Sequence, residues 1–250
     1  MVFVAGNGKG GGEGLLIAII AMVVLAVWTG TNIGGASEPS THLPTSGTAQ
    51  PRTGAPSAPA ETSSAEGVYG SSLEMLAAIP ARTDERVPEY RRDQFGTGWL
   101  DTDGNGCDTR NDILARDLDD IVVDTRCRVL SGTLVDQYTG TTIAFTRGET
   151  SSQAVQIDHI FPLAQAWYGG AWRWSDEERA AFANDPAELI AVDGPTNNSK
   201  GAKTISQWTP PNPSYQCEYA ASYVEVAYLY QLSMSSTDKA AATRILEACG

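Results

Sequence analysis

The hydrophobic positions divide the chain into an apolar N-terminal run, a spacer without large apolar residues, and a longer region with helix and strand patterns. Residues 15–28 are apolar without interruption, and a tract rich in Ser, Thr, Pro, Ala and Gly follows. The run is shorter than the roughly 20 residues of a membrane-spanning helix and suits a signal peptide or a short anchor. We therefore predict a signal peptide or membrane anchor over residues 1–33, a disordered linker over 34–69 and a folded domain over 70–250.

Helical periodicity is clearest near the two ends of the region after the spacer. The helices predicted from periodicity and capping signals are residues 71–79, 108–118, 162–167, 175–182 and two after residue 215. In the last part, residues recur at helical spacing and predict a buried stripe of Tyr219, Tyr223, Val226 and Tyr230. Because Ser236 can cap a second helix there, we expect a C-terminal helical hairpin.

Runs rich in β-branched residues occupy the middle of the chain. Residues 132–135 and 141–145 flank the turn sequence Tyr138-Thr139-Gly140 and predict a β-hairpin. Two further strand-like runs, residues 154–157 and 188–192, lie on either side of a helical connection. The expected fold class is therefore α+β, with a small N-terminal subdomain that contains the hairpin.

The charge balance restricts how the folded region can bind its partners. The sequence has 17 Lys and Arg against 30 Asp and Glu, a formal net charge of −13. A protein that wraps duplex nucleic acid usually carries a basic face, because its cations displace counterions from the phosphates. The acidic balance argues against extensive wrapping, but it allows a small cleft with a metal cation and a few basic side chains.

The 4 cysteines all follow the apolar N-terminal run. An even number in an exported chain predicts two disulfides, for which three connectivities are allowed. We favour Cys107–Cys127 and Cys217–Cys249, because an antiparallel helical hairpin would bring the second pair together. The alternative is a zinc ion held by all the thiolates, although the closely spaced cysteine pairs of zinc fingers are absent from the sequence.

The candidate chemistry centres on Asp158 and His159, which directly follow the first of the two late strands. Of the 2 histidines in the sequence, His42 lies in the spacer, so His159 is the imidazole of the folded region. A neutral imidazole titrates near neutral pH and can accept a proton from water. After the second strand, Asn197 offers a neutral oxygen ligand. Lys200, one turn further on, can neutralise a phosphate oxygen or be a solvated helix residue.

The order strand, Asp-His-Ile-Phe-Pro, long connection, strand and Asn-x-x-Lys-Gly resembles the HNH, or ββα-metal, endonucleases. The segments 167–186, 191–194 and 208–211 are similar to one branch of them, the exported bacterial proteins related to the C-terminal domain of GmrSD-type restriction enzymes. The resemblance covers roughly residues 70–250. It implies a ββα-metal nuclease core with His159 as general base and with Asp158 and Asn197 as metal ligands. Oxygen ligands select a hard cation, so we expect Mg²⁺ or Mn²⁺.

This chain departs from the HNH pattern at one position. The last histidine of the signature is absent, and the region of Asn197 and Lys200 stands in its place. The ligand set is therefore open, with Asp193 or Asn198 as substitutes for Asn197. The connection between His159 and Asn197 is also long for such a core, so we expect it to loop out as a tryptophan-rich helical insertion.

An acidic loop before the second predicted helix has two interpretations. The stretch from Asp101 to Gly106, with Asp112 further on, matches the spacing of a calcium loop and makes Asp101, Asp103 and Asn105 candidate Ca²⁺ ligands. The alternative, which we favour, is a turn rich in Asp, Asn and Gly that caps the following helix.

Basic and aromatic side chains elsewhere also have a functional and a structural interpretation. Arg91 and Arg92 can reach a phosphate, but we prefer ion pairs with neighbouring acids on a solvated face. Trp172, Trp174 and Trp208 can stack on nucleobases, but packing on the core is the preferred role.

These observations favour an exported, metal-dependent endonuclease that hydrolyses phosphodiester bonds of nucleic acid, with DNA as the expected substrate. We expect a monomer that is secreted, or held at the membrane only by its N-terminal segment. The alternative function is a non-catalytic, disulfide-stapled, calcium-binding module of the cell surface. A third hypothesis is an HNH fold that has lost catalysis and serves as a scaffold.

Overall fold

A computed structural model of the protein describes residues 68–149 and 151–250. The expected signal peptide or anchor and nearly all of the expected linker lie outside these residues, so both stay predictions. Within the described part of the chain, no helix combines the length and the apolar character needed to cross a membrane.

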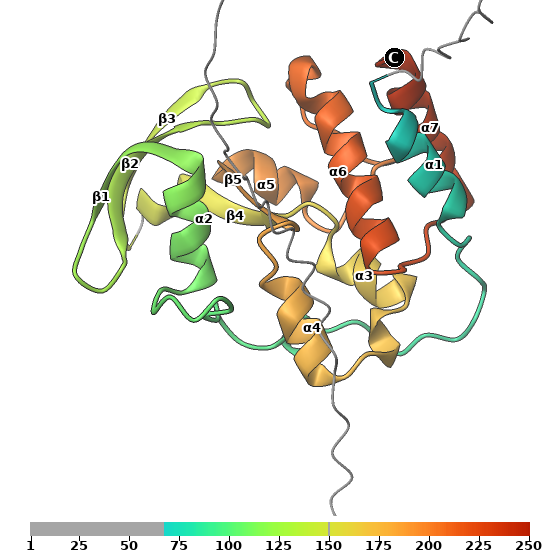
Figure 1. Cartoon of the computed structure of the whole chain (residues 1–250), viewed down its shortest axis with the longest axis horizontal. Coiled ribbons are helices and arrows are strands. Elements are labelled where there is room, and N and C mark those ends of the chain that lie inside the picture. Colours follow the sequence, from blue (N-terminus) through green and yellow to red (C-terminus); the bar gives the residue numbers. More distant parts are fainter. Residues whose placement is uncertain (1–67, 150) are drawn as a thin grey trace, which may run out of the picture. The chain divides into compact units, whose positions relative to one another are not determined.

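The described residues form a mixed α and β structure (Figure 1). Its α-helices are α1 (Gly70–Ala78), α2 (Thr109–Asp117), α3 (Leu163–Gly169), α4 (Asp176–Ala183), α5 (Gly194–Lys200), α6 (Gln216–Leu229) and α7 (Ser236–Ala248). Its strands are β1 (Leu118–Val123), β2 (Val129–Val135), β3 (Thr142–Thr146), β4 (Val155–His159) and β5 (Leu189–Asp193). The α+β class expected from the sequence is confirmed at this level.

The strands form two separate antiparallel sheets. In the first sheet the order is β1-β2-β3, and Val135 pairs with Thr142 across a turn in which Gly140 has a φ of 72°. This is the hairpin predicted from the turn sequence. In the second sheet β4 pairs with β5, with Ile157 opposite Ala191. Because β5 is antiparallel to β4, α5 begins beside Val155 at the start of β4, and its last residue, Lys200, reaches Asp158 near the end of β4.

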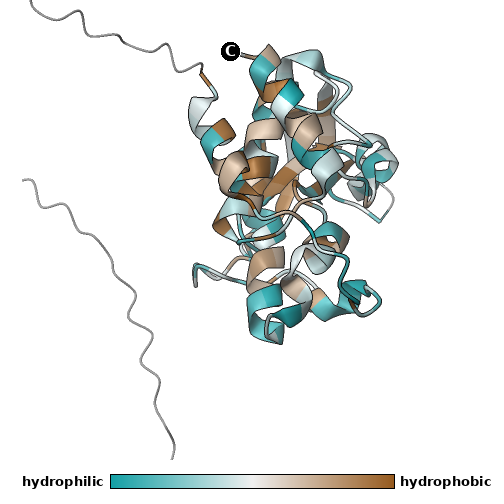
Figure 2. Cartoon of the chain, turned by 90° about the vertical axis from the view of Figure 1, so that its right-hand side faces the viewer, coloured by the Kyte–Doolittle hydropathy of each residue, from teal (hydrophilic) through white to brown (hydrophobic). Residues whose placement is uncertain are grey.

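Two hydrophobic clusters hold these elements in place. The larger one joins α1, α3, α6 and α7 and buries Tyr219 and Tyr223 of the predicted stripe. The smaller one joins α2 to the first sheet and to β4 through side chains that include Leu114 and Val155. Hydrophobic segments concentrate toward the interior in Figure 2. The tryptophans that pack against the larger cluster, as preferred from the sequence, are Trp172, Trp174 and Trp208.

The two predicted disulfides are confirmed. Cys107–Cys127 joins the loop before α2 to the turn after β1, with a Cα–Cα distance of 5.3 Å. Cys217–Cys249 joins the start of α6 to the residue after α7, with a Cα–Cα distance of 5.9 Å. The second disulfide closes the C-terminal helical hairpin, which is also confirmed. No cysteine of the described residues is free, so the four-thiolate zinc alternative is wrong.

Candidate active site

The strand β4 carries Asp158 and His159 at its C-terminal end. Successive side chains of a regular strand point to opposite faces, but that alternation relaxes where the strand ends. Both side chains are buried, and both line the same cavity. The end of β4 therefore brings a carboxylate and an imidazole to one site.

Two buried donors fix the carboxylate of Asp158. Its Oδ2 accepts a hydrogen bond from the Tyr138 hydroxyl at 2.6 Å and another from Lys200 Nζ at 2.6 Å. Tyr138 lies between β2 and β3, and Lys200 ends α5, so two distant parts of the chain hold one oxygen. No hydrogen bond from a described residue reaches Oδ1. That oxygen is available to a ligand in the cavity.

Lys200 is fully buried, with a relative exposure of 0%. Besides Asp158, its ammonium donates a hydrogen bond to the main-chain oxygen of His159 at 2.6 Å. A buried ammonium needs such partners, because leaving it unpaired costs several kcal/mol. The alternative of a solvated helix residue is therefore wrong. Lys200 is not among the residues that line the cavity, and its contact with a substrate phosphate stays an untested prediction.

The imidazole of His159 is held between a carbonyl group and an indole. Its Nε2 lies 3.0 Å from the main-chain oxygen of Ala183, and the Trp99 ring stacks on it with 6.1 Å between centroids. A carbonyl oxygen only accepts hydrogen bonds, so Nε2 carries the proton and Nδ1 keeps its lone pair. Burial lowers the pKa of His159 to about 4, which keeps the ring neutral at neutral pH. A neutral ring with a free lone pair can accept a proton, but the lowered pKa makes His159 a weaker base than an exposed imidazole.

Asn197 projects from α5 toward the same cavity. Its Nδ2 donates a hydrogen bond to Gln156 Oε1 at 3.0 Å, which leaves Oδ1 as an acceptor for another ligand. Asn198 also lines the cavity, whereas Asp193 is the N-cap of α5 and accepts hydrogen bonds from Thr196. Of the two substitutes considered for Asn197, the cavity therefore includes Asn198.

The cavity has a volume of about 380 Å³ and contains Asp158, His159 and Asn197 in its wall. A smaller cavity of about 100 Å³ adjoins His159 on the side of Trp99. A separate cavity of about 760 Å³ beside Trp174 contains none of the candidate residues. The candidate residues Asp158, His159 and Asn197 therefore share the 380 Å³ cavity, which we call the catalytic cavity after the role proposed for it below.

Tyr90 and Arg92 complete the wall of the catalytic cavity, and sequence reasoning did not place them there. They come from the segment between α1 and α2, which contains a short 3-10 helix over Arg92–Phe95. The sequence offers no signal that separates Arg92 from its neighbour Arg91. Their different surroundings arise only in the folded structure.

The catalytic cavity offers the kinds of oxygen donor that a divalent cation held mainly by water would use. Asp158 Oδ1 and Asn197 Oδ1 are the two available ligands, one charged and one neutral. Mg²⁺ is usually held by one or two carboxylates together with several waters, so this set suits it. Within residues 68–149 and 151–250, no group of three or more His, Cys, Asp and Glu side chains could hold a metal ion. Mg²⁺ or Mn²⁺ at this site therefore stays a proposal.

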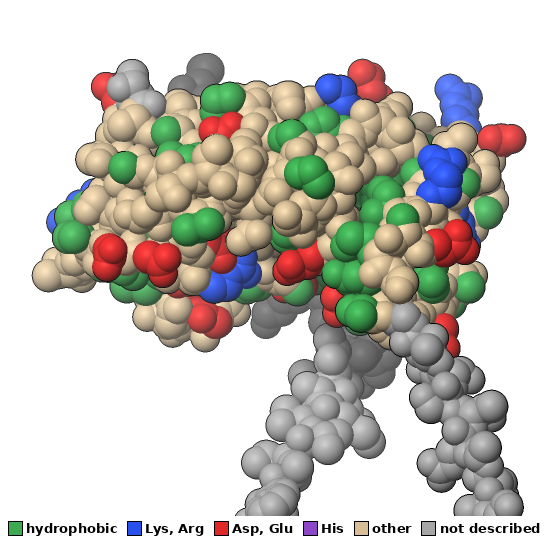
Figure 3. Space-filling model, turned by 90° about the horizontal axis from the view of Figure 1, so that it is seen from above, with side chains coloured by type: hydrophobic (Ala, Val, Ile, Leu, Met, Phe, Trp, Pro, Cys, Tyr) green, Lys and Arg blue, Asp and Glu red, His purple; other side chains and the backbone are tan. Residues whose placement is uncertain are grey.

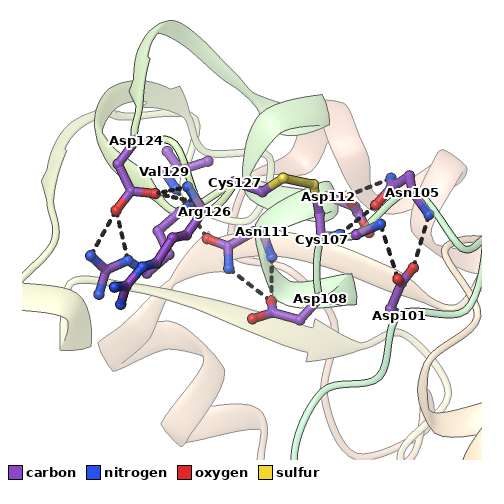
Figure 4. Close-up of a disulfide and its surroundings, with 12 residues drawn as sticks. Asp101, Asn105, Cys107, Asp108, Asn111, Asp112, Asp124, Arg126, Cys127 and Val129 are labelled. Carbon is purple, nitrogen blue, oxygen red and sulfur yellow. Dashed lines mark hydrogen bonds and ion pairs between the residues drawn. A yellow bond between two sulfur atoms is a disulfide. The ribbon is translucent and has the colours of Figure 1, made fainter.

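The acidic loop before α2 makes most of its hydrogen bonds within itself (Figure 4). The carboxylate of Asp101 accepts main-chain hydrogen bonds of 2.9 to 3.1 Å from the loop. The side-chain amide of Asn105 donates to Asp103 at 2.9 Å and to Asp112 at 3.2 Å. The neighbouring Asp108 is the N-cap of α2. These contacts agree with the preferred interpretation as a turn, and Ca²⁺ at Asp101, Asp103 and Asn105 stays a prediction.

The surface charge follows the composition on the face shown in Figure 3. Lys and Arg side chains on this face are few and lie scattered among Asp and Glu. This face offers no continuous basic surface among the described residues, in line with the formal net charge of −13. It does not suit extensive contact with a nucleic-acid duplex.

Gly194 provides a test of how α5 is positioned. A Cβ atom at this first residue of α5 would lie 1.9 Å from the main-chain oxygen of Gln153. We expect Gly194→Ala to displace α5 from β4 and to lower the unfolding free energy by about 1–3 kcal/mol, because the chain must shift to remove the clash. Urea unfolding measures this loss. The exposed Ser199→Ala on the same helix should change stability by no more than about 0.5 kcal/mol. Equal stability of the two variants would contradict the close approach.

Comparison with known proteins shows that this chain is similar to one protein family and to a protein of another organism. The family model of GmrSD restriction endonucleases, C-terminal domain, matches residues 108–240. A protein of Arthroderma benhamiae, described as an uncharacterized secreted protein, is 36% identical over 177 residues, which are 70% of this chain and 83% of the relative. No solved structure matches the chain. Because this relative is fungal, the bacterial branch expected from the sequence has no support here.

Proposed function

This chain belongs to the family of the C-terminal domains of GmrSD restriction endonucleases, and we propose that it is an exported, metal-dependent endonuclease of the HNH type. The observation that carries the proposal is the cavity in which Asp158, His159 and Asn197 meet. All three residues lie within the part of the chain that the family model matches. The antiparallel strands β4 and β5, followed at once by α5, support a ββα-metal core.

The side chains that line the catalytic cavity would have different roles in phosphodiester hydrolysis. His159, neutral and oriented by the Ala183 carbonyl, would take the proton of the attacking water at Nδ1. Asp158 Oδ1 and Asn197 Oδ1 would hold Mg²⁺ or Mn²⁺. When bound, such an ion supplies a Lewis acid for the charge that develops on the phosphate oxygens.

Lys200 would contribute through Asp158. Its ammonium holds Oδ2 of that carboxylate and the main-chain oxygen of His159, so it fixes the end of β4 from the side opposite the cavity. We therefore assign Lys200 a positioning role in place of the phosphate contact expected from the sequence.

Export and substrate are parts of the same proposal. The relative from Arthroderma benhamiae is described as secreted, and two disulfides suit an oxidising compartment. The family name points to nucleic acid as the substrate, and DNA is our first choice.

Incubation of the purified protein with supercoiled plasmid tests the proposal. We expect nicked and linear products with Mg²⁺ or Mn²⁺, and a rate lower by about 10²-fold or more with excess EDTA, because a metal supplies several kcal/mol of transition-state stabilisation. An RNA substrate run in parallel decides the preference between the two nucleic acids. Cleavage that persists in EDTA would refute the requirement for a divalent metal ion. Absence of cleavage of both nucleic acids with both metals would refute the nuclease and favour a scaffold or a binding module.

A further inference from the structure

Arg92 is the one Lys or Arg among the residues that line the catalytic cavity. Lys200 lies behind the Asp158 carboxylate and is fully buried, so its charge is already used. A phosphodiester bound in the cavity would bring its negative charge close to the Asp158 carboxylate. A cation fixed in the cavity wall offsets the resulting repulsion better than water does. Within the described residues, the cavity therefore contains a single arginine suited to a phosphate.

The guanidinium of Arg92 forms no ion pair with any residue that the structure describes. Every ion pair among the described residues involves another basic side chain, and the neighbouring Arg91 pairs with Asp93 through two hydrogen bonds of 3.1 Å. Arg91 does not line the catalytic cavity. The two adjacent arginines therefore differ in their surroundings. Arg91 pairs with Asp93 away from the catalytic cavity, whereas the exposed Arg92 lines the cavity and has no ion pair with a described residue.

The main chain under Arg92 is held in place by buried contacts. Arg92 begins the 3-10 helix that ends at Phe95, whose ring is buried in an aromatic group with Trp167 and Phe182. The buried Arg179 donates a hydrogen bond from Nε to the main-chain oxygen of Gln94 at 2.7 Å. A cation presented from an anchored segment loses less entropy when it binds a ligand.

Arg92 also lies beside the proposed general base. Arg92 and His159 both line the catalytic cavity, and both line the smaller 100 Å³ cavity next to Trp99. Arg92 and His159 therefore contribute to the walls of both cavities. A phosphate placed against Arg92 would lie close to the ring that activates its attacking water.

We propose that Arg92 is a catalytic residue that binds the scissile phosphate of the nucleic acid through its planar guanidinium. The inference rests on the proposed nuclease function and adds a residue that binds the phosphate of the substrate. Arginine suits this role because its fork of N–H donors matches two oxygens of one phosphate, which a lysine ammonium cannot do. A single cation in the cavity wall also implies that binding at this site depends only weakly on salt.

The test compares Arg92→Ala, Arg92→Lys and the matched control Arg91→Ala with the parent protein on plasmid in Mg²⁺. We expect Arg92→Ala to lose about 10²-fold in kcat, as for removal of one donor to a developing charge, and Arg92→Lys to recover only part of it. Arg91→Ala should stay within about threefold of the parent, because the ion pair it removes is exposed. Thermal unfolding of each variant shows that the fold is kept.

A binding series in the His159→Ala background separates substrate binding from catalysis. The probe is a fluorescein-labelled single-stranded oligonucleotide, and its Kd is measured by anisotropy over a range of salt concentrations. Removing one phosphate contact should flatten the plot of log Kd against log salt by about 0.7 in Arg92→Ala and leave it unchanged in Arg91→Ala. A merely structural role for Arg92 would not change this slope.

The outcomes distinguish the inference from the function on which it rests. If the parent cleaves nucleic acid and Arg92→Ala behaves as Arg91→Ala does in rate and in salt slope, the assignment of Arg92 is overturned. If the parent does not cleave, the proposed function fails, and the binding series alone judges Arg92. A flattened slope confined to Arg92→Ala then supports a phosphate contact, and equal slopes overturn it.

Discussion

Replacing His159 with alanine should lower the rate of plasmid cleavage by about 10²- to 10⁴-fold, because the variant lacks the general base. The imidazole, with Nε2 donating to the Ala183 carbonyl, is neutral at neutral pH, and the described residues that line the catalytic cavity include no other imidazole. The measurement is kcat on supercoiled plasmid in Mg²⁺ at constant pH.

The matched control for this loss is His42→Ala, which removes the other histidine of the sequence and should cleave as the parent does. Because His159 is buried and stacks on Trp99, near-UV circular dichroism and thermal unfolding should accompany the assay. A folded His159→Ala protein that cleaves at the parental rate would remove His159 from the mechanism.

Replacing Lys200 with methionine should lower the unfolding free energy by about 3–5 kcal/mol, because it leaves the Asp158 carboxylate buried without its charged partner. Lys200 has a relative exposure of 0% and donates to both Asp158 and the main chain of His159, so the variant also releases the end of β4. Urea unfolding at neutral pH, without divalent cations, measures the effect.

Lys203→Met is the control for this prediction. Lys203 is exposed and lies three residues further along the same segment, so its replacement should change stability by no more than about 0.5 kcal/mol. The double variant Asp158→Asn/Lys200→Met should be more stable than Lys200→Met alone, because it removes the unpaired charge. If the two lysine variants are equally stable, the buried ion pair does not hold the site together.

The elements of the site were predictable because their signals are local. The alternation of β-branched residues gives β4 and β5, and the capping sequence at Ser175 gives α4, where both hydrogen bonds of the capping box are present. Asp158 and His159 were proposed because a carboxylate and an imidazole follow a strand-like run, and the structure places both within β4 as its last two residues. The disulfide pairs followed from the expected antiparallel arrangement of the last two helices.

The contacts that tune these residues were not predictable, because they join distant parts of the chain. The Ala183 carbonyl that fixes the tautomer of His159 is 24 residues away, and the Tyr138 hydroxyl on Asp158 is 20 residues away. Nothing in the local pattern around Lys200 distinguishes a fully buried ion pair from a solvated end of a helix. The sequence also does not show that Arg91 pairs with Asp93 while Arg92 lines a cavity whose other walls come from residues 156–164 and 197–202.

The family model begins at residue 108, yet one wall of the catalytic cavity is built from Tyr90 and Arg92, and Trp99 covers the imidazole. An expression fragment trimmed to residues 108–240 would keep the carboxylate, the imidazole and the amide while exposing them to bulk solvent on that side. A fusion protein that carries this domain should therefore include the segment from α1 onward, because the residues that enclose the cavity begin before the residues that the family model matches.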